Sequence, residues 1–225
     1  MPTRRSSDFR RIEAQKEVAG QVHYIFTGEP RYTFRRFSNL DTILGRRVSD
    51  NAVSKEYGGR KCGTHSPSAS RPGHISDELR ESFEWVGYRL CTDNIVLPGL
   101  IEVYPHPALV ELSGASERVL YKAAKVRLYW PLASRLERRD MLLRQWADIV
   151  DSLEIQIAGV SAALSPLEMN ASRIVLKAYE DIPDAVICAW VAICSLEGLA
   201  IPYGDKDSEI WIPSPGTART QRLEA

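Results

Sequence analysis

The chain has 225 residues, of which 44% are hydrophobic and 26% charged, as in an ordinary globular domain. Its 29 lysines and arginines balance 29 aspartates and glutamates, which argues against a protein that holds nucleic acid by bulk positive charge. The longest apolar run, residues 185–194, is about half the roughly 20 residues that a membrane-spanning helix needs. With no secretory signal and four cysteines that suggest no disulfide framework, we expect a cytoplasmic protein without a membrane partner.

The zero net charge hides an uneven distribution along the chain. Residues 1–47 contain ten basic and five acidic side chains, a net charge of +5, which leaves −5 for the remainder. This first segment has little periodicity, and its best strand candidate is 22–26. We therefore predict an atypical basic N-terminal segment over 1–45, either a solvated arm or an arm that contacts nucleic acid.

Periodicity and turn residues predict the remaining elements. Before the middle of the chain, we expect a short helix over 48–57, a loop over 58–74, an amphipathic helix over 75–90 with Ser76 as its N-cap, and a buried strand over 100–104. From residue 105 onward, we expect a short helix that stops at Gly114, then one long helix or two abutting ones over 135–164. A short strand over 173–177 and a buried helix over 183–196 follow. The chain is expected to close with a hairpin of strands 201–203 and 209–212 and a flexible tail over 214–225.

Two groups of acids stand out against these elements. Glu102 occupies the middle of the buried strand, where a carboxylate costs several kcal/mol unless it is paired. It is either paired with an arginine, tipped into solvent at the strand end, or a metal ligand or acid–base group. Asp181 and Asp184 come at the start of the buried helix, where they either cap it or, facing Glu102, form a carboxylate cluster. Such a cluster of oxygen ligands suits Mg²⁺ or Mn²⁺.

Several stretches, taken in order, resemble the DUF429 family, a group predicted to be nucleases with a ribonuclease H-like fold. The matching stretches are 46–58, 100–109, 121–131, 138–153, 177–198 and 204–213. The resemblance implies an α/β domain over 46–213 with a ribonuclease H-like mixed sheet flanked by helices, and an incomplete or altered N-terminal strand set. It also implies metal-dependent cleavage of nucleic-acid phosphodiesters, in DNA or RNA, with two metal ions held by carboxylates.

The resemblance implies roles for the same acids. Glu102 matches the family's mid-sheet glutamate, and Asp181 and Asp184 match the acids at the start of the last helix, so these three are the predicted catalytic residues and Mg²⁺ or Mn²⁺ ligands. Glu180 is a spare, and Lys177 is a candidate to neutralise phosphate or the carboxylate cluster.

The front of the chain departs from the family pattern. The fold's first strand normally carries an aspartate of the metal site, and only about 45 residues precede the Arg47-x-x-Asp50 stretch, fewer than a three-stranded meander needs. The chain therefore resembles a member with its front missing or replaced. The alternatives are an inactive copy that serves as a nucleic-acid or protein binding module and, by fold analogy only, an enzyme acting on a small phosphorylated substrate.

Two weaker candidates come from other residue types. Cys62, His65 and His74 have a zinc-like spacing without a second cysteine pair, which favours a plain loop. Lys122, Lys125, Arg127, Tyr129 and Trp130 interleave basic and aromatic side chains. They form either a surface on which nucleic-acid bases stack or a helix end that packs over the core.

Overall fold

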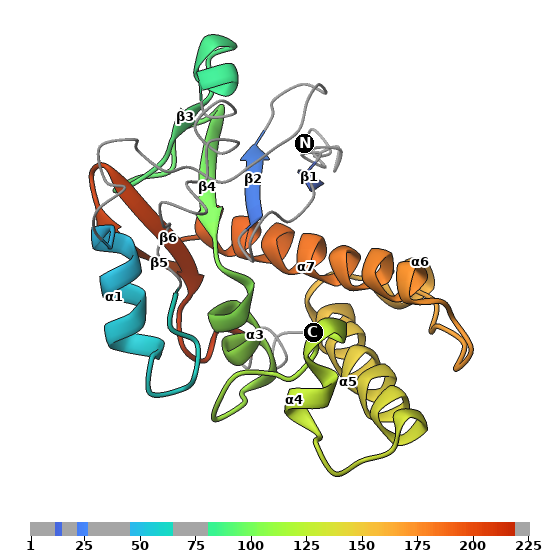
Figure 1. Ribbon diagram of the computed structural model, residues 1–225. Helices are drawn as coiled ribbons and strands as arrows, with labels where there is room; N and C mark the ends of the chain where they lie inside the picture. The colour runs from blue at the N-terminus through green and yellow to red at the C-terminus, as the bar shows by residue number, and fades with distance from the viewer. Residues whose placement is uncertain (1–11, 15–21, 27–45, 65–80, 219–225) are drawn as a thin grey trace.

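The computed structural model describes residues 12–14, 22–26, 46–64 and 81–218. Its strands form one mixed sheet in the order β1-β2-β4-β6-β5, with β3 pairing with β4 (Figure 1). β4 is antiparallel to β2 and parallel to β3 and β6. The strands are β1 (Ile12–Ala14), β2 (Val22–Phe26), β3 (Arg89–Leu90), β4 (Gly99–Val103), β5 (Ala200–Asp205) and β6 (Ser208–Pro213).

Helices cover this sheet, so the predicted α/β class with a mixed sheet is confirmed. They are α1 (Val48–Tyr57), α3 (Pro105–Ser113), the short 3₁₀ helix η2 (Ala123–Lys125), α4 (Val126–Tyr129), α5 (Arg135–Gln156), α6 (Val160–Ala163) and α7 (Arg173–Leu196). Local chemistry explains several of their ends. Ser134 and Glu137 form a capping box at the start of α5, and Gly114 ends α3 in the left-handed conformation at φ 67°.

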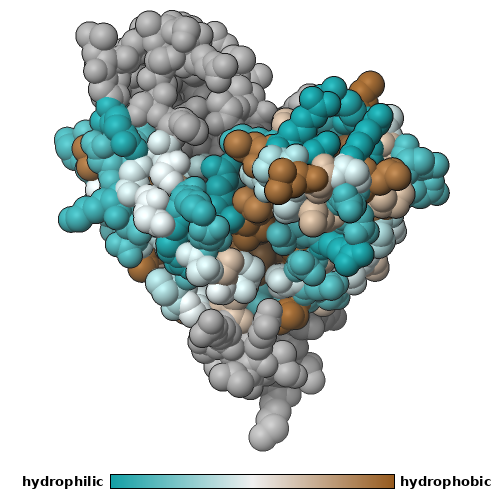
Figure 2. Space-filling view, turned by 60° about the horizontal axis from the view of Figure 1, so that its bottom comes forward, coloured by the Kyte–Doolittle hydropathy of each residue, from teal (hydrophilic) through white to brown (hydrophobic). Residues whose placement is uncertain are grey.

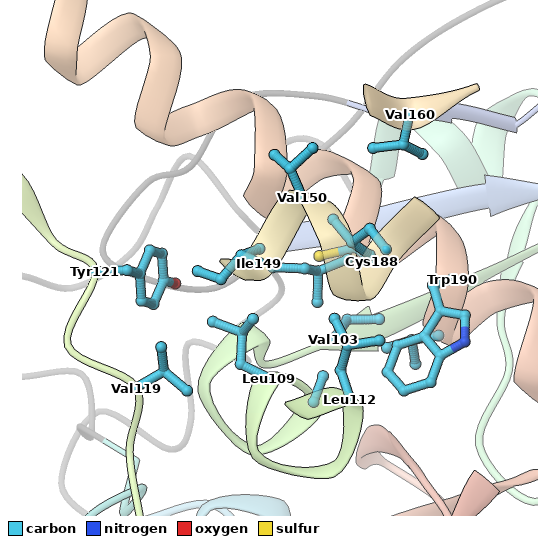
Figure 3. Packing of buried hydrophobic residues seen from close by; sticks show 14 of the residues in the cluster. Val103, Leu109, Leu112, Val119, Tyr121, Ile149, Val150, Val160, Cys188 and Trp190 are labelled. Carbon is cyan, nitrogen blue, oxygen red and sulfur yellow. The ribbon is translucent and has the colours of Figure 1, made fainter. Parts of the chain in front are cut away.

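The sheet separates two hydrophobic clusters. Trp211 of β6 belongs to the large cluster with α3, α5 and α7, whereas its neighbours Ile210 and Ile212 belong to a smaller cluster with α1. Because successive side chains of a strand point to opposite faces, α1 lies on one face of the sheet and α7 on the other. Figure 3 shows the large cluster, where Val103 of β4 meets side chains of α3, α5 and α7.

Most of the predicted elements are confirmed. The strand 22–26, the helix 48–57 and the buried strand near 100–104 appear as β2, α1 and β4. β5 and β6 form the predicted hairpin. The region 135–164 contains two helices, as one of the two predicted alternatives had it: α5 ends before the extended residue Ile157, and Gly159, with φ 91°, caps the start of α6.

Two of the predicted stretches, one in each half of the chain, differ from the structure. Residues 173–177 are not a strand but the first turns of α7, which begins after the N-cap Ser172 and continues through Pro183. The helix therefore starts about ten residues earlier than predicted. The predicted helix over 75–90 also ends too late, because residues 81–85 are helical but 89–90 form β3.

Some predictions fall outside the described residues. They are the basic arm as a whole, the candidate zinc ligands His65 and His74, the Ser76 cap and the tail from residue 219. Before that point, Thr217 and Ala218 are buried. Among the described helices, none combines the length and the apolarity that crossing a bilayer requires.

A buried carboxyl group in β6 gives a first test of the fold. Glu209 is 5% exposed, and its Oε2 atom has no hydrogen-bond partner among the described residues. Burial, with smaller contributions from the Asp93 and Asp205 carboxylates, raises the pKa of Glu209 to about 7. The folded protein therefore binds a proton more tightly than the unfolded chain does.

We expect this group to make the protein less stable as the pH rises. Its contribution is fully present below the ordinary pKa of about 4.5 and is lost as the pH passes through about 7. The unfolding free energy of the wild type should fall between pH 5 and pH 8, and urea denaturation measures that fall. In Glu209→Gln the fall should be smaller by roughly 2 kcal/mol. The exposed control Glu168→Gln should leave the fall unchanged, and equal slopes for wild type and Glu209→Gln would contradict the assignment.

Candidate functional site

The buried glutamate of β4 is paired with an arginine. Arg47 is the N-cap residue of α1, and its guanidinium donates hydrogen bonds to both oxygens of Glu102, at 2.7 Å from Nη1 and 2.8 Å from Nη2. The same side chain donates to Asp50 at 3.0 Å from Nε and 3.2 Å from Nη2. All three side chains are buried. Arg47 therefore forms a bidentate bridge between the start of α1 and the centre of the sheet.

The electrostatics of this first network favour the charged arginine. Burial opposes the charge on Arg47, but Glu102 and then Asp50 outweigh that effect and raise the pKa of the guanidinium. Both oxygens of Glu102 and both of Asp50 already accept hydrogen bonds from Arg47.

A second network lies on α7. Lys177, Glu180, Asp181 and Asp184 are spaced at i, i+3, i+4 and i+7, which places them along one side of the helix. The Nζ atom of Lys177 donates to Glu180 at 2.9 Å and to Asp181 at 2.7 Å. Of the two roles considered for Lys177, the structure thus supports neutralisation of the carboxylates.

The segment before η2 binds the far end of this row. Lys122 donates to Asp184 Oδ2 at 2.5 Å, and the Tyr121 hydroxyl donates to Asp184 Oδ1 at 2.6 Å. The backbone N–H of Ala123 donates to Glu180 Oε2 at 2.6 Å, and Lys122 also lies 3.6 Å from Glu180 Oε1. Asp184, Glu180 and Lys122 are buried. Both oxygens of Asp184 are therefore engaged by donors from one short segment.

Three edge-on rings link the surroundings of the two networks. His106, at the start of α3, packs edge-on against Tyr104 at 5.2 Å and against Tyr121 at 5.4 Å between ring centroids. Tyr104 belongs to the cluster on the α1 face and Tyr121 to the cluster on the α7 face. Arg118 also contacts His106 Nε2. The His106 ring thus contacts one tyrosine ring from each of the two clusters.

The predicted site residues come from a strand of the sheet and from a helix that packs on one of its faces. Glu102 points away from the face of its strand neighbours Ile101 and Val103, which belong to the α7-side cluster, and pairs with Arg47 at α1. Asp184 and Asp181 lie on α7, which packs on the other face. Among the residues that the structure describes, no three His, Cys, Asp or Glu side chains are grouped as a metal ion would require.

The candidate metal ligands therefore do not fit a shared metal ion in this arrangement. Glu102 and Asp184 come from opposite faces of the sheet, and donors occupy both oxygens of each. The remaining acid, Asp181, accepts a hydrogen bond from Lys177. A divalent cation would have to compete with these three basic side chains for carboxylates that point in different directions.

The sequence predicts Lys177 and an unspecified arginine as partners of these acids, but it does not identify Arg47 or Lys122 in that role. Arg47 and Asp50 were noticed only as a spacing shared with a family, and Lys122 only as part of a basic and aromatic stretch. A signal for the α7 network was present, because the charged spacing 177, 180, 181, 184 is that of one helix face. It was obscured by the prediction of a strand over 173–177.

In the basic and aromatic stretch over 122–130, the two aromatic rings pack toward the core. Trp130 packs against the large hydrophobic cluster, and the hydroxyl oxygen of Tyr129 is buried. Burial raises the pKa of Tyr129. Cys62, Cys188 and Cys194 are likewise buried, and burial raises the pKa of Cys194 to about 12, as expected for an inert core thiol.

The fold and the sequence motifs together assign the chain to a family. The sequence model of DUF429, a protein family of unknown function, matches residues 40–208 of the 225. The chain therefore belongs to the DUF429 family, as its resemblance implied. No curated protein and no solved structure matches it.

Proposed function

We propose that this protein is a nuclease-like module that binds a macromolecular partner and does not itself cut phosphodiester bonds. One observation carries the proposal: Glu102 and Asp184 lie on opposite faces of the sheet, each bonded to its own cation. Their chemistry is that of buried ion pairs that hold elements together. The family resemblance and the mixed sheet support a ribonuclease H-like domain over residues 46–213 as the framework of this module.

A second candidate is the metal-dependent nuclease that the resemblance implies. It is favoured by the gathering of Glu180, Asp181 and Asp184 along one side of α7. In this alternative Asp181 and Asp184, with Glu102, would bind Mg²⁺ or Mn²⁺, and the substrate would be DNA or RNA. The metal would supply activation of water and stabilisation of the leaving oxygen.

Metal binding and cleavage separate the two candidates. Calorimetric titration with Mn²⁺ should detect no saturable site in the wild type, because the acids that would bind it are already paired. Labelled single- and double-stranded DNA and RNA should stay intact in the presence of Mg²⁺. The matched variants are Glu102→Gln and Asp184→Asn, each checked for folding by circular dichroism.

Two results would overturn the proposal in favour of the nuclease. The first is a saturable Mn²⁺ signal that Asp184→Asn or Glu102→Gln abolishes while the variant remains folded. The second is Mg²⁺-dependent cleavage that is lost in the same variants. Retardation of an intact strand, weakening linearly with the logarithm of salt concentration, would instead support binding of nucleic acid without catalysis.

A further inference from the structure

The segment from α4 through the following turn to the start of α5 presents large apolar side chains to solvent. Leu128 is 76% exposed, Leu132 is 100% exposed and Leu136 is 71% exposed. The turn lies at the lower end of the molecule in Figure 1, and Figure 2 brings that end forward, with brown hydrophobic side chains among the teal ones. We call these three leucines the leucine tip. Three exposed leucines within nine residues of the chain make this segment a candidate interaction surface.

The segment that carries the leucine tip is strongly basic. Residues 125–139 contain five lysines and arginines and one glutamate, a net charge of +4 in a chain of zero net charge. The glutamate, Glu137, is engaged in the capping box of α5. Arg127 and Arg135 are exposed beside the leucines, and neither forms an ion pair within the described part of the chain. The surface therefore combines apolar anchors with uncompensated positive charge.

The chemistry of this surface favours a protein partner over a nucleic acid. A single strand of nucleic acid is held by basic side chains along its phosphate backbone together with stacking of its bases on open aromatic faces. Here the aromatic residues are packed. Trp130 contacts the core, and the Tyr129 ring lies edge-on to the Trp130 ring, with the two ring centroids 5.7 Å apart. The exposed groups are aliphatic, and leucines are complemented by the apolar stripe of an amphipathic helix.

We propose that the leucine tip, with Arg127 and Arg135, docks an acidic amphipathic helix of a partner protein. The inference deepens the proposed binding function and rests on it. The leucines would contact the apolar stripe of that helix, and the two arginines would pair with carboxylates beside the stripe. The apolar contacts supply affinity, and the charges supply orientation and the rate of association.

The test uses the full chain and a defined probe. The probe is a fluorescein-labelled helical peptide of about 20 residues, with leucines at helical spacing on one side and glutamates elsewhere. A scrambled peptide of the same composition is the reference. Fluorescence anisotropy should show saturable binding of the patterned peptide only, and Leu132→Ser should weaken it by about tenfold or more.

Paired variants separate the two parts of the surface. The double variant Arg127→Glu and Arg135→Glu should also weaken binding by about tenfold and remove most of its dependence on salt. The control Ile174→Ser removes an exposed apolar side chain on α7, and Lys206→Glu reverses an exposed charge in the turn between β5 and β6. Both controls should bind the probe like the wild type.

Several results would overturn this inference. They are no saturable binding, equal binding of the scrambled peptide, or unchanged binding by Leu132→Ser. Leucine-dependent binding of vesicles containing phosphatidylserine, or of single-stranded oligonucleotides, with no binding of the peptide would assign the surface to a membrane or a nucleic acid instead. A Mn²⁺ site or cleavage activity would overturn only the proposed function, because those experiments probe the carboxylates and not the leucine tip.

Discussion

Replacing Arg47 with methionine is expected to lower the free energy of unfolding by about 3–5 kcal/mol, because it leaves two buried carboxylates without their cation. Four hydrogen bonds from the guanidinium to Asp50 and Glu102 are lost together. Methionine fills a similar volume, so the loss reports the unpaired charges rather than a cavity. Urea denaturation at neutral pH measures it.

Further variants tie this loss to the buried charges. Combining Arg47→Met with Asp50→Asn and Glu102→Gln should recover much of the stability, since neutral amides replace the unpaired carboxylates. Lys61 and Glu117 form an ion pair at 2.5 Å with side chains 68% and 48% exposed, and Lys61→Met should cost less than about 1 kcal/mol. Arg47→Met would contradict the assignment if its effect were as small as that of Lys61→Met.

The elements of this fold follow closely from patterns in the sequence. The regular recurrence of Leu142, Trp146 and Ile149 predicts the buried side of α5, and all three are buried there. Pro183 misled the prediction of α7, because proline is common in a first turn. The apolar spacing of Leu176, Tyr179 and Pro183 continues the helix upstream, and the structure follows that spacing.

The arrangement of the candidate site was less accessible from the sequence. Arg47 and Glu102 are 55 residues apart, and no periodic pattern says which of the chain's many arginines turns inward to meet the acid. Alternation along β4 does say that Glu102 faces away from Ile101 and Val103. It does not say on which face α7 packs, and that packing places Asp184 and Glu102 on opposite sides of the sheet.

The two networks differ in the kinds of donor that bind their carboxylates. In the first, Arg47 donates to all four carboxylate oxygens of its partners. In the second, Asp184 also accepts a hydrogen bond from Tyr121, and Glu180 accepts one from the backbone of Ala123. Loss of the lysine in the second network therefore leaves part of the hydrogen bonding in place.

Replacing Lys122 with methionine is accordingly expected to cost roughly 2–4 kcal/mol, somewhat less than the change at Arg47. The lysine is buried between Asp184 and Glu180, so its removal takes a positive charge away from both carboxylates. Lys206→Met, at an exposed lysine in the turn between β5 and β6, should have little effect on stability. Urea denaturation in chelator and in Mn²⁺ measures both variants.

The response of Lys122→Met to metal also tests how the carboxylates are arranged. If Glu102 and the acids of α7 are separate structural pairs, Mn²⁺ has no converging set of ligands and should leave the variant as unstable as it is in chelator. If the lysine instead occupies the position of a metal ion, Mn²⁺ should restore stability, and the gain should rise with the logarithm of the Mn²⁺ concentration above the dissociation constant. Restoration that is lost on adding Glu102→Gln would bring Glu102 and Asp184 into one metal site and would overturn the ion-pair assignment.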